Sequence, residues 1–230
     1  EGSIMKFTFK IQQYQTEAVA SLVDCFEGQL PANGVQYLRD KGLMPKLVKQ
    51  DVQTELFEKQ KTEDEQLEES DTGYRNADLI LSDKELLDNI HKIQDRNFII
   101  HSEKIEKTAN SPSFDIEMET GTGKTYVYTN TMYELNKVYG WSKFIIVVPS
   151  LPIREGVFKS LEYTQDHFMQ RYGKKIRYFI YNSKRLNLLD QYSSSADINV
   201  MIINMQAFNS SLNKDKNVAG RKGNEAARII

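Results

Sequence analysis

The sequence of 230 residues contains one cysteine and three histidines, and these low numbers exclude several kinds of site. A lone Cys25 cannot form an internal disulfide, and it fits a protein of the reducing cytoplasm. We expect its thiol to be a small buried apolar group on a helix. His91, His101 and His167 lie far apart without the spacing of zinc ligands, so no structural metal is predicted.

Long apolar runs and a strong net charge are also missing. No run of about 18 apolar residues occurs, so no segment is predicted to span a membrane. The first four residues lack the pattern of a secretion signal and look like a cloning scar before a native start at Met5. With 40% hydrophobic and 27% charged residues, we expect a soluble globular chain of one large or two small domains. Its net charge of −2 means that any binding of nucleic acid must depend on local basic groups and backbone amides.

The segment FDIEMETGTGKTYVYT, residues 114–129, has the pattern of a phosphate-binding loop. Residues 114–118 are predicted to form a buried strand, and Gly121 and Gly123 permit a tight turn before a helix that begins at Lys124. The N–H groups of such a turn and the positive end of the following helix form a nest for anions. We therefore predict that this loop binds ATP with Mg²⁺.

Individual roles follow from the side chains of the loop. Lys124 is expected to reach the β- and γ-phosphate oxygens, and the Thr125 hydroxyl to take one position around Mg²⁺. These two residues are the predicted catalytic pair, and Thr125 is the predicted metal ligand. The cofactor-binding residues predicted here are Thr120, Gly121, Thr122, Gly123, Lys124 and Thr125.

The octapeptide METGTGKT resembles motif I of superfamily two helicases and DNA translocases, with Met118 where the full pattern has glycine. Tyr14-Gln15, just before a predicted helix, resembles the Q motif of the same proteins, which reads adenine. A glutamine amide has a donor and an acceptor side by side, which match adenine N6 and N7. An exposed glutamine at a helix start is the alternative interpretation.

The remaining sequence alternates between helical and strand patterns. Helices are expected around residues 18–26, 84–95, 124–139 and 154–172, and strands at 143–148, 175–182 and 198–204. The apolar run at 143–148 is typical of a strand covered on both faces. This order predicts an α/β fold, an incomplete RecA-like P-loop domain with a parallel sheet and a helical, acidic insertion.

The ends of two predicted strands carry a second group of candidate site residues, for DNA binding. VVPSLPIREGV, residues 147–157, resembles helicase motif Ia, and IINMQAFN, residues 202–209, resembles motif Ib. Both would contact the DNA backbone, which positions a strand without reading its sequence. Arg154 fits either a phosphate contact or a pair with an acidic neighbour. The predicted DNA-binding residues are Ser150, Arg154, Asn204 and Gln206.

We expect three parts along the chain. Residues 1–30 form the adenine-reading segment, 31–112 a helical insertion, and 113–230 part of a first RecA-like ATPase domain. Within the insertion, residues 51–71 are predominantly acidic and are typical of a solvated helix or linker.

Together these motifs resemble the restriction subunit of type III restriction–modification enzymes, along nearly the whole chain. The resemblance implies an ATP- and Mg²⁺-dependent motor on double-stranded DNA that cuts DNA and works with a methyltransferase subunit. It also implies an amino-terminal fragment, because no Asp-Glu box follows a predicted strand: Asp190 precedes Gln191, and Asp197 precedes Ile198. We therefore expect this chain to hydrolyse almost no ATP. A type I restriction motor, a stand-alone helicase and a non-catalytic nucleotide-binding module are the alternatives.

Overall fold

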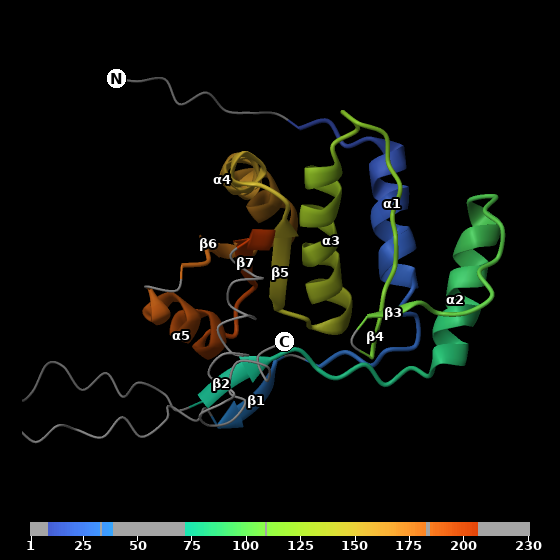
Figure 1. The fold of residues 1–230 in the computed structure, drawn as a ribbon, viewed down its shortest axis with the longest axis horizontal. Helices are drawn as coiled ribbons and strands as arrows, with labels where there is room; N and C mark the ends of the chain where they lie inside the picture. The colour runs from blue at the N-terminus through green and yellow to red at the C-terminus, as the bar shows by residue number, and fades with distance from the viewer. Residues whose placement is uncertain (1–8, 33, 39–71, 109, 183–184, 207–230) are drawn as a thin grey trace, which may run out of the picture.

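A computed structural model describes residues 9–32, 34–38, 72–108, 110–182 and 185–206, so the acidic stretch 51–71 lies outside the described residues. The fold is mixed α/β (Figure 1). Its helices are α1 (Gln13–Asp24), α2 (Asp83–Arg96), α3 (Lys124–Tyr139), α4 (Leu151–Tyr172) and α5 (Leu186–Ser194). Its strands are β1 (Val35–Leu38), β2 (Thr72–Arg75), β3 (Lys107–Thr108), β4 (Ser111–Pro112), β5 (Lys143–Val148), β6 (Arg177–Ile180) and β7 (Asn199–Asn204). None of the helices in these ranges is apolar and long enough to cross a membrane.

A parallel three-stranded sheet forms the centre of the fold, in the order β5-β7-β6. This confirms the predicted parallel sheet. Strand β7 is buried almost throughout because it has a neighbour on each side. The core on the face covered by α3 and α4 consists of Met132, Tyr133, Val148, Val157, Leu161, Phe168, Ile176, Ile198, Val200 and Ile202.

Strand β5 has the predicted bounds, but its expected cover on both faces is wrong for the described chain. Ile145 is 37% exposed and Val147 is 43% exposed, whereas Val148 belongs to the core. Ile145 pairs in register with Met201, so both lie on the face opposite α3 and α4. On that face the described cover comes from α5, which contacts β7.

The predicted strand at 114–118 is also wrong, because these residues form an extended strap outside the sheet. Phe114 packs edge-on against Phe26, with ring centroids 5.6 Å apart, and Met118 packs against the core shared by α1 and α3. The alternating residues Asp115 and Glu117 are exposed. An apolar–acidic alternation suits a one-sided contact with a helix, and the strap takes this position in front of α1 (Figure 1).

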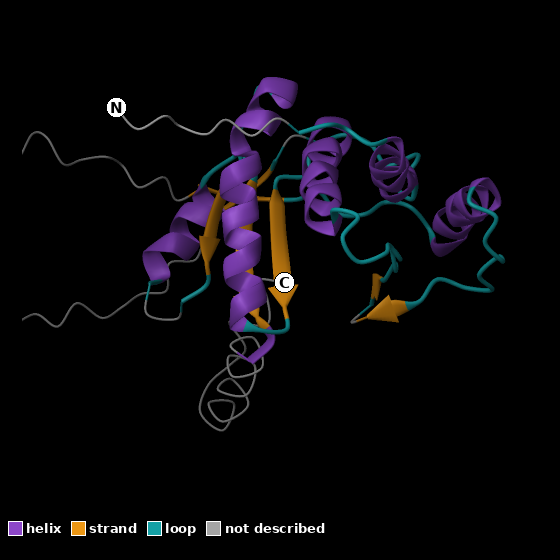
Figure 2. Ribbon diagram, turned by 90° about the horizontal axis from the view of Figure 1, so that it is seen from above, coloured by secondary structure: helices purple, strands orange, loops and turns teal. Residues whose placement is uncertain are grey.

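Helices α3, α1 and α2 lie side by side at increasing distance from the sheet (Figures 1 and 2). The predicted apolar face of α1 is confirmed, since Val19 and Val23 are buried against α3. Cys25 is also buried, as expected, and burial together with the charge of Asp24 raises its thiol pKa to about 11. The thiol is therefore protonated at neutral pH and a poor nucleophile.

The insertion contains more strand than the sequence indicated. Strands β1 and β2 pair antiparallel, as do β3 and β4, and only α2 is helical within the described part of residues 31–112. Helix α2 begins with a capping box, in which Ser82 accepts from the Glu85 amide and the Glu85 carboxylate accepts from the Ser82 amide. Outside the insertion, α5 was not predicted, because the serines that follow its leucines are typical of a polar connection.

Asn89 of α2 holds the end of α1. Its side chain is 6% exposed and donates to the Cys25 and Glu27 carbonyls at 3.3 and 2.9 Å. We expect Asn89→Ala to lower the free energy of unfolding by about 1–3 kcal/mol, because two carbonyls lose a buried donor. Urea denaturation measures this change. The neighbouring exposed Asp88→Ala is the control, and an equal loss in both variants would contradict the assignment.

Candidate functional site

The glycine loop before α3 has the backbone conformation that the sequence predicted. Gly121 has a φ of 86° and Gly123 a φ of 85°, both in the left-handed region where residues with a Cβ are strained. Helix α3 then begins at Lys124, so the first-turn N–H groups face the loop. Inside the loop, the Thr122 hydroxyl donates to the Glu119 carbonyl at 2.7 Å. The result is a compact turn at the positive end of a helix of 16 residues.

The Lys124 side chain folds back over the start of this loop. Its ammonium donates to the Met118 carbonyl and to the Glu119 carbonyl, the latter at 2.8 Å. The side chain is exposed, and it therefore meets solvent and the loop backbone together. An ammonium in this position can exchange these carbonyls for the oxygens of an anion bound at the loop.

Tyr14 and Gln15 of α1 lie against the same loop. The Tyr14 hydroxyl donates to the Thr122 carbonyl at 3.1 Å, and the Gln15 amide donates to the same oxygen at 2.9 Å. These contacts join segments more than 100 residues apart, and no pattern in the sequence indicated a common acceptor. The structure thus brings both candidate adenine-binding residues to the glycine loop.

Gly123 is the most constrained point of this contact. A Cβ at this position would lie 2.6 Å from Gln15 Nε2. We expect Gly123→Ala to weaken binding of a fluorescent ATP analogue about tenfold or more, because a left-handed alanine costs about 1–2 kcal/mol before the clash is relieved. Fluorescence titration measures the change.

Gly156→Ala is the matched control for that substitution. Gly156 lies within α4, and a Cβ added to it would meet no atom within 4 Å beyond its chain neighbours and the nearby backbone of its own helix. We expect this variant to bind the analogue as the unchanged protein does and to gain up to about 1 kcal/mol of stability. Unchanged binding by the Gly123 variant would show that the loop tolerates a side chain.

Thr125 occupies the first turn of α3 and is partly buried. Its carbonyl accepts from the Thr129 hydroxyl at 2.7 Å, which is a contact within the helix. A hydroxyl oxygen in this place is a suitable ligand for a hard cation. The described residues hold no group of three or more His, Cys, Asp or Glu side chains that could bind a metal by themselves.

The second group of candidates lies at the carboxyl ends of β5 and β7. Val148 pairs in register with Asn204, so the loops that follow these strands start side by side. Ser150 precedes the first residue of α4 and is partly buried, whereas Asn204 is 6% exposed. Gln206 is exposed two residues later. The structure brings these two strand ends together at the edge from which β5 points toward the amino end of α3 (Figure 1).

Arg154 has an acidic neighbour as its partner. Its guanidinium donates to the Glu155 carboxylate at 2.8 and 3.2 Å. The sequence left open whether Arg154 pairs with an acid or binds phosphate, and in this structure it forms the acid pair. To contact a phosphate, the guanidinium would have to bind the phosphate and Glu155 together, or break its contact with Glu155.

An aromatic group beside the glycine loop was not anticipated. The Tyr126 hydroxyl lies 2.9 Å from His167 Nε2, and Phe9 packs against both rings. Burial lowers the pKa of His167, and the charge of Arg171 lowers it further, so the neutral imidazole is favoured. This cluster fixes the first turn of α3 against α4. The closely spaced aromatic residues of the two helices were the only sign of this cluster in the sequence.

Known proteins resemble this chain over much of its length. Residues 8–227 match the family described as type III restriction enzyme, Res subunit. Over 112 residues the chain is 40% identical to the Res subunits of the type III restriction-modification enzymes EcoPI of Escherichia phage P1 and EcoP15I of Escherichia coli. It is 37% identical over 138 residues to the StyLTI Res subunit of Salmonella typhimurium.

The matched parts cover 48% of this chain and 11% of the EcoPI and EcoP15I subunits. For StyLTI they cover 52% of this chain and 14% of the relative. The chain thus spans a small part of the length of these relatives, whereas the family match extends over nearly all of its own residues. On that match, the chain belongs to the family of type III restriction enzyme Res subunits.

Proposed function

We propose that this chain is the ATP-binding part of an ATP-dependent, DNA-translocating type III restriction endonuclease subunit. The observation that carries the proposal is the left-handed turn at Gly121 and Gly123, followed directly by Lys124 at the start of α3. A turn of this kind presents backbone N–H groups and one ammonium to an anion, which is what the phosphates of a nucleotide require. In this proposal the surrounding α/β unit is a partial RecA-like domain.

The residues of the glycine loop have separate roles in the proposed nucleotide site. Gly123 adopts a left-handed conformation, and a Cβ there would displace the Gln15 amide, so a glycine keeps the backbone N–H groups of the turn open to a phosphate. Lys124 would hold the terminal phosphates, and Thr125 would hold Mg²⁺ together with phosphate oxygens and water. Bound ATP with Mg²⁺ supplies the free energy of hydrolysis, and this chain's residues bind and orient it.

The adenine would be recognised at α1. Gln15 lies on the loop through its donor, and turning its amide outward would offer a donor and an acceptor to a purine edge. Tyr14 would flank the base with its half-exposed ring. A competition titration tests this assignment: Gln15→Ala should reduce the preference for ATP over GTP, while Gln13→Ala at the exposed helix start should leave it unchanged.

A DNA-contacting surface is proposed at the carboxyl ends of β5 and β7. Ser150, Gln206 and the neighbouring amides would touch phosphates, with Arg154 and Asn204 reached after local side-chain movement. Double-stranded DNA is the proposed substrate of the whole protein. The proposed partner of the whole protein is a methyltransferase subunit that recognises the site.

The proposal divides the chain into three parts. Residues 1–30 would supply the adenine contact and 113–230 the phosphate loop, and 31–112 would form an insertion between them. The described part of the insertion packs through α2 on the carboxyl end of α1.

The proposal predicts binding without turnover for the 230-residue chain. In the described part of the chain no Asp-Glu pair follows a strand, and carboxylates at that place would position the metal and the attacking water. The test is a titration with a fluorescent ATP analogue and Mg²⁺, followed by a phosphate-release assay with and without DNA. Saturable binding without phosphate release supports the proposal, and absence of binding overturns it. DNA-stimulated release would overturn the expectation of inactivity.

A further inference from the structure

A groove of about 760 Å³ runs between α1, α2 and residues 113–119, which include the strap. It begins beside Tyr14 and Thr122 and extends to the far end of α2, where Asn97 and Ile99 line it. The apolar part of its lining includes partly buried side chains, namely Ala18, Leu22, Ile90, Ile93, Ile105, Phe114 and Met118. Buried Cys25 and the exposed Ile99 and Ile116 also line it. This groove is therefore an elongated apolar surface open to solvent rather than a sealed cavity.

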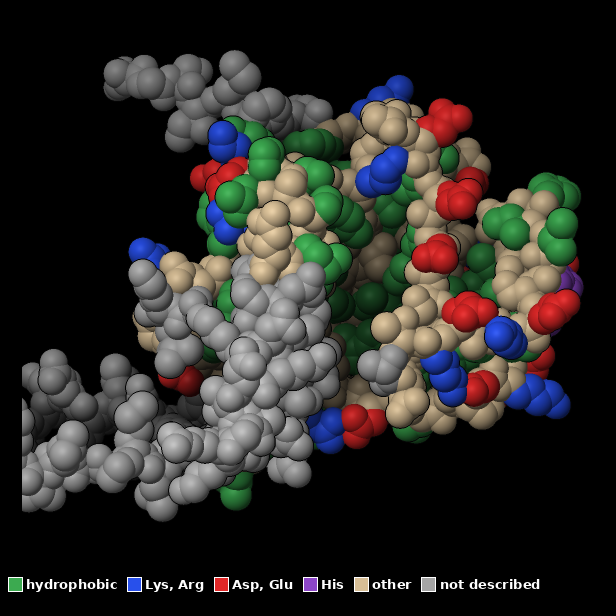
Figure 3. All heavy atoms as spheres, viewed as in Figure 1, with side chains coloured by type: hydrophobic (Ala, Val, Ile, Leu, Met, Phe, Trp, Pro, Cys, Tyr) green, Lys and Arg blue, Asp and Glu red, His purple; other side chains and the backbone are tan. Residues whose placement is uncertain are grey.

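Every charged residue that lines the groove is acidic. These carboxylates are Glu17, Glu106, Asp115, Glu117 and Glu119, and all five residues are exposed. In Figure 3 acidic side chains follow the ridge of backbone that crosses in front of α1. Within the described part of the chain, Asp115, Glu117 and Glu119 form no ion pair, whereas Glu106 lies 3.8 Å from the Lys104 ammonium. The rim of the groove thus carries a net negative charge above an apolar floor.

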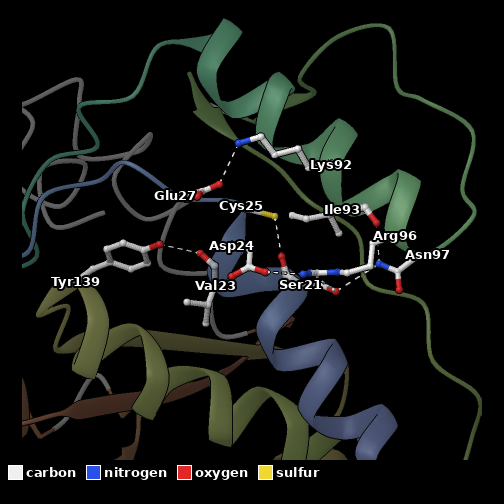
Figure 4. Close-up of polar contacts among 10 residues, drawn as sticks. All are labelled: Ser21, Val23, Asp24, Cys25, Glu27, Lys92, Ile93, Arg96, Asn97 and Tyr139. Atoms are coloured by element: carbon white, nitrogen blue, oxygen red, sulfur yellow. Dashed lines mark hydrogen bonds and ion pairs between the residues drawn. The ribbon is translucent and has the colours of Figure 1, made fainter.

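Two basic residues of α2, Lys92 and Arg96, pair with carboxylates at the end of α1 and just after it. Arg96 pairs with Asp24 at 2.9 Å, and Lys92 pairs with Glu27 at 3.0 Å (Figure 4). Asn97 adds a contact to the Ser21 hydroxyl at 3.4 Å. These contacts hold α2 against α1 and fix the width of the groove without neutralising its rim.

An exposed apolar segment continues the groove beyond α2. Phe98 is 97% exposed, Ile99 56% and Ile100 91%. Phe98 also has a φ of 56°, in the left-handed region that is unusual for a bulky residue. Adjacent large side chains held in solvent at the mouth of an apolar groove are typical of a surface that contacts another protein.

From these features we infer that the groove binds a basic amphipathic helix of a protein partner. An apolar stripe of such a helix fits the lining, and its lysine or arginine side chains fit the five rim carboxylates. The same carboxylates repel the phosphates of DNA. They also lack the arrangement of a metal site, since no described group of three or more acidic, His or Cys side chains could hold an ion.

The test uses the 230-residue chain and fluorescent peptides of about 18 residues, which is five helical turns. One peptide has a leucine stripe with lysines on the other face, one has serines in place of leucines, and one has glutamates in place of lysines. Fluorescence anisotropy at low ionic strength should show saturable binding of the leucine–lysine peptide alone. Added salt should weaken that binding because the rim charges are exposed.

Two pairs of matched variants assign the site. Asp115→Asn with Glu117→Gln should weaken binding roughly three- to tenfold, whereas Glu162→Gln with Asp166→Asn on the exposed face of α4 should leave it unchanged. Ile99→Ser should also weaken it, and Ile80→Ser, 58% exposed and outside the groove, should not. Circular dichroism confirms that each variant is folded.

Several results would overturn the inference. They are equal binding of the glutamate or serine peptide, an equal effect of the α4 variant, and absence of saturable binding. Any of these would mean that the rim and the lining do not act together. A selective loss in the Asp115 and Glu117 variant and in Ile99→Ser would support it, and neither change touches Lys124 or the glycine loop.

Discussion

Replacing Lys124 with alanine is expected to weaken binding of ATP with Mg²⁺ by roughly ten- to a hundredfold. A hydrogen bond to a charged group contributes about 1.5–3 kcal/mol, which corresponds to that range of affinity. Lys124 stands directly after the left-handed Gly123, and its ammonium already lies over the Met118 and Glu119 carbonyls. It therefore needs only a short movement to meet a phosphate at the loop.

Titration with a fluorescent ATP analogue measures this loss. The matched control is Lys137→Ala, which removes an exposed lysine near the other end of α3, where Lys137 lies 3.5 Å from Glu134. Both variants remove one positive charge from the same helix, so a general effect of charge would appear in both. Equal affinity of the two variants would contradict a phosphate contact by Lys124. A loss confined to Lys124→Ala assigns the nucleotide to the amino end of the helix.

Local sequence patterns predicted the glycine loop and its helix well. The turn needs Gly121 and Gly123 in the left-handed region, and Gly140, with a φ of 75°, ends α3 where the sequence indicated. Strand β5 was placed at its observed bounds, because a continuous apolar run leaves few alternatives. These features depend on neighbours within a few residues, which a single sequence shows directly.

The strap at 114–118 shows where local patterns are insufficient. Alternation of Phe114, Ile116 and Met118 with acidic residues fits an edge strand and fits an extended segment on a helix equally well. The choice depends on Phe26, which is distant in sequence and contacts Phe114. Tertiary contact therefore decided the conformation, and no period in the sequence could reveal it.

The contacts between α1 and the glycine loop were only half predictable. Tyr14 and Gln15 were identified from a motif, but their shared acceptor, the Thr122 carbonyl, depends on the packing of α1 against α3. Asn76 illustrates the same limit, since its side chain accepts from the Ser142 and Lys143 amides at 2.8 and 2.9 Å and so fixes the start of β5. An asparagine in a connecting segment carries no local sign of such a role.

Replacing Phe168 with alanine is expected to lower the free energy of unfolding by about 3–5 kcal/mol. The Phe168 side chain is 0% exposed and lies between α4 and α3. Its ring stacks with Tyr133 at 4.9 Å and with Tyr126 at 5.1 Å between centroids. Truncation therefore removes a large buried surface together with these aromatic contacts, and it leaves a cavity that the sheet behind it cannot fill.

Urea denaturation monitored by circular dichroism measures the loss, with Phe98→Ala as the control. The two substitutions remove the same atoms, but Phe98 is 97% exposed, so its loss should change stability by no more than about 0.5 kcal/mol. Because Tyr126 follows Thr125 on the first turn of α3, the Phe168 variant should also weaken nucleotide binding through a less ordered helix start. Equal stabilities of the two variants would contradict a core shared by α3 and α4. A large loss in Phe168→Ala alone would show that the packing of α4 on α3 holds the amino end of α3 in place beneath the phosphate loop.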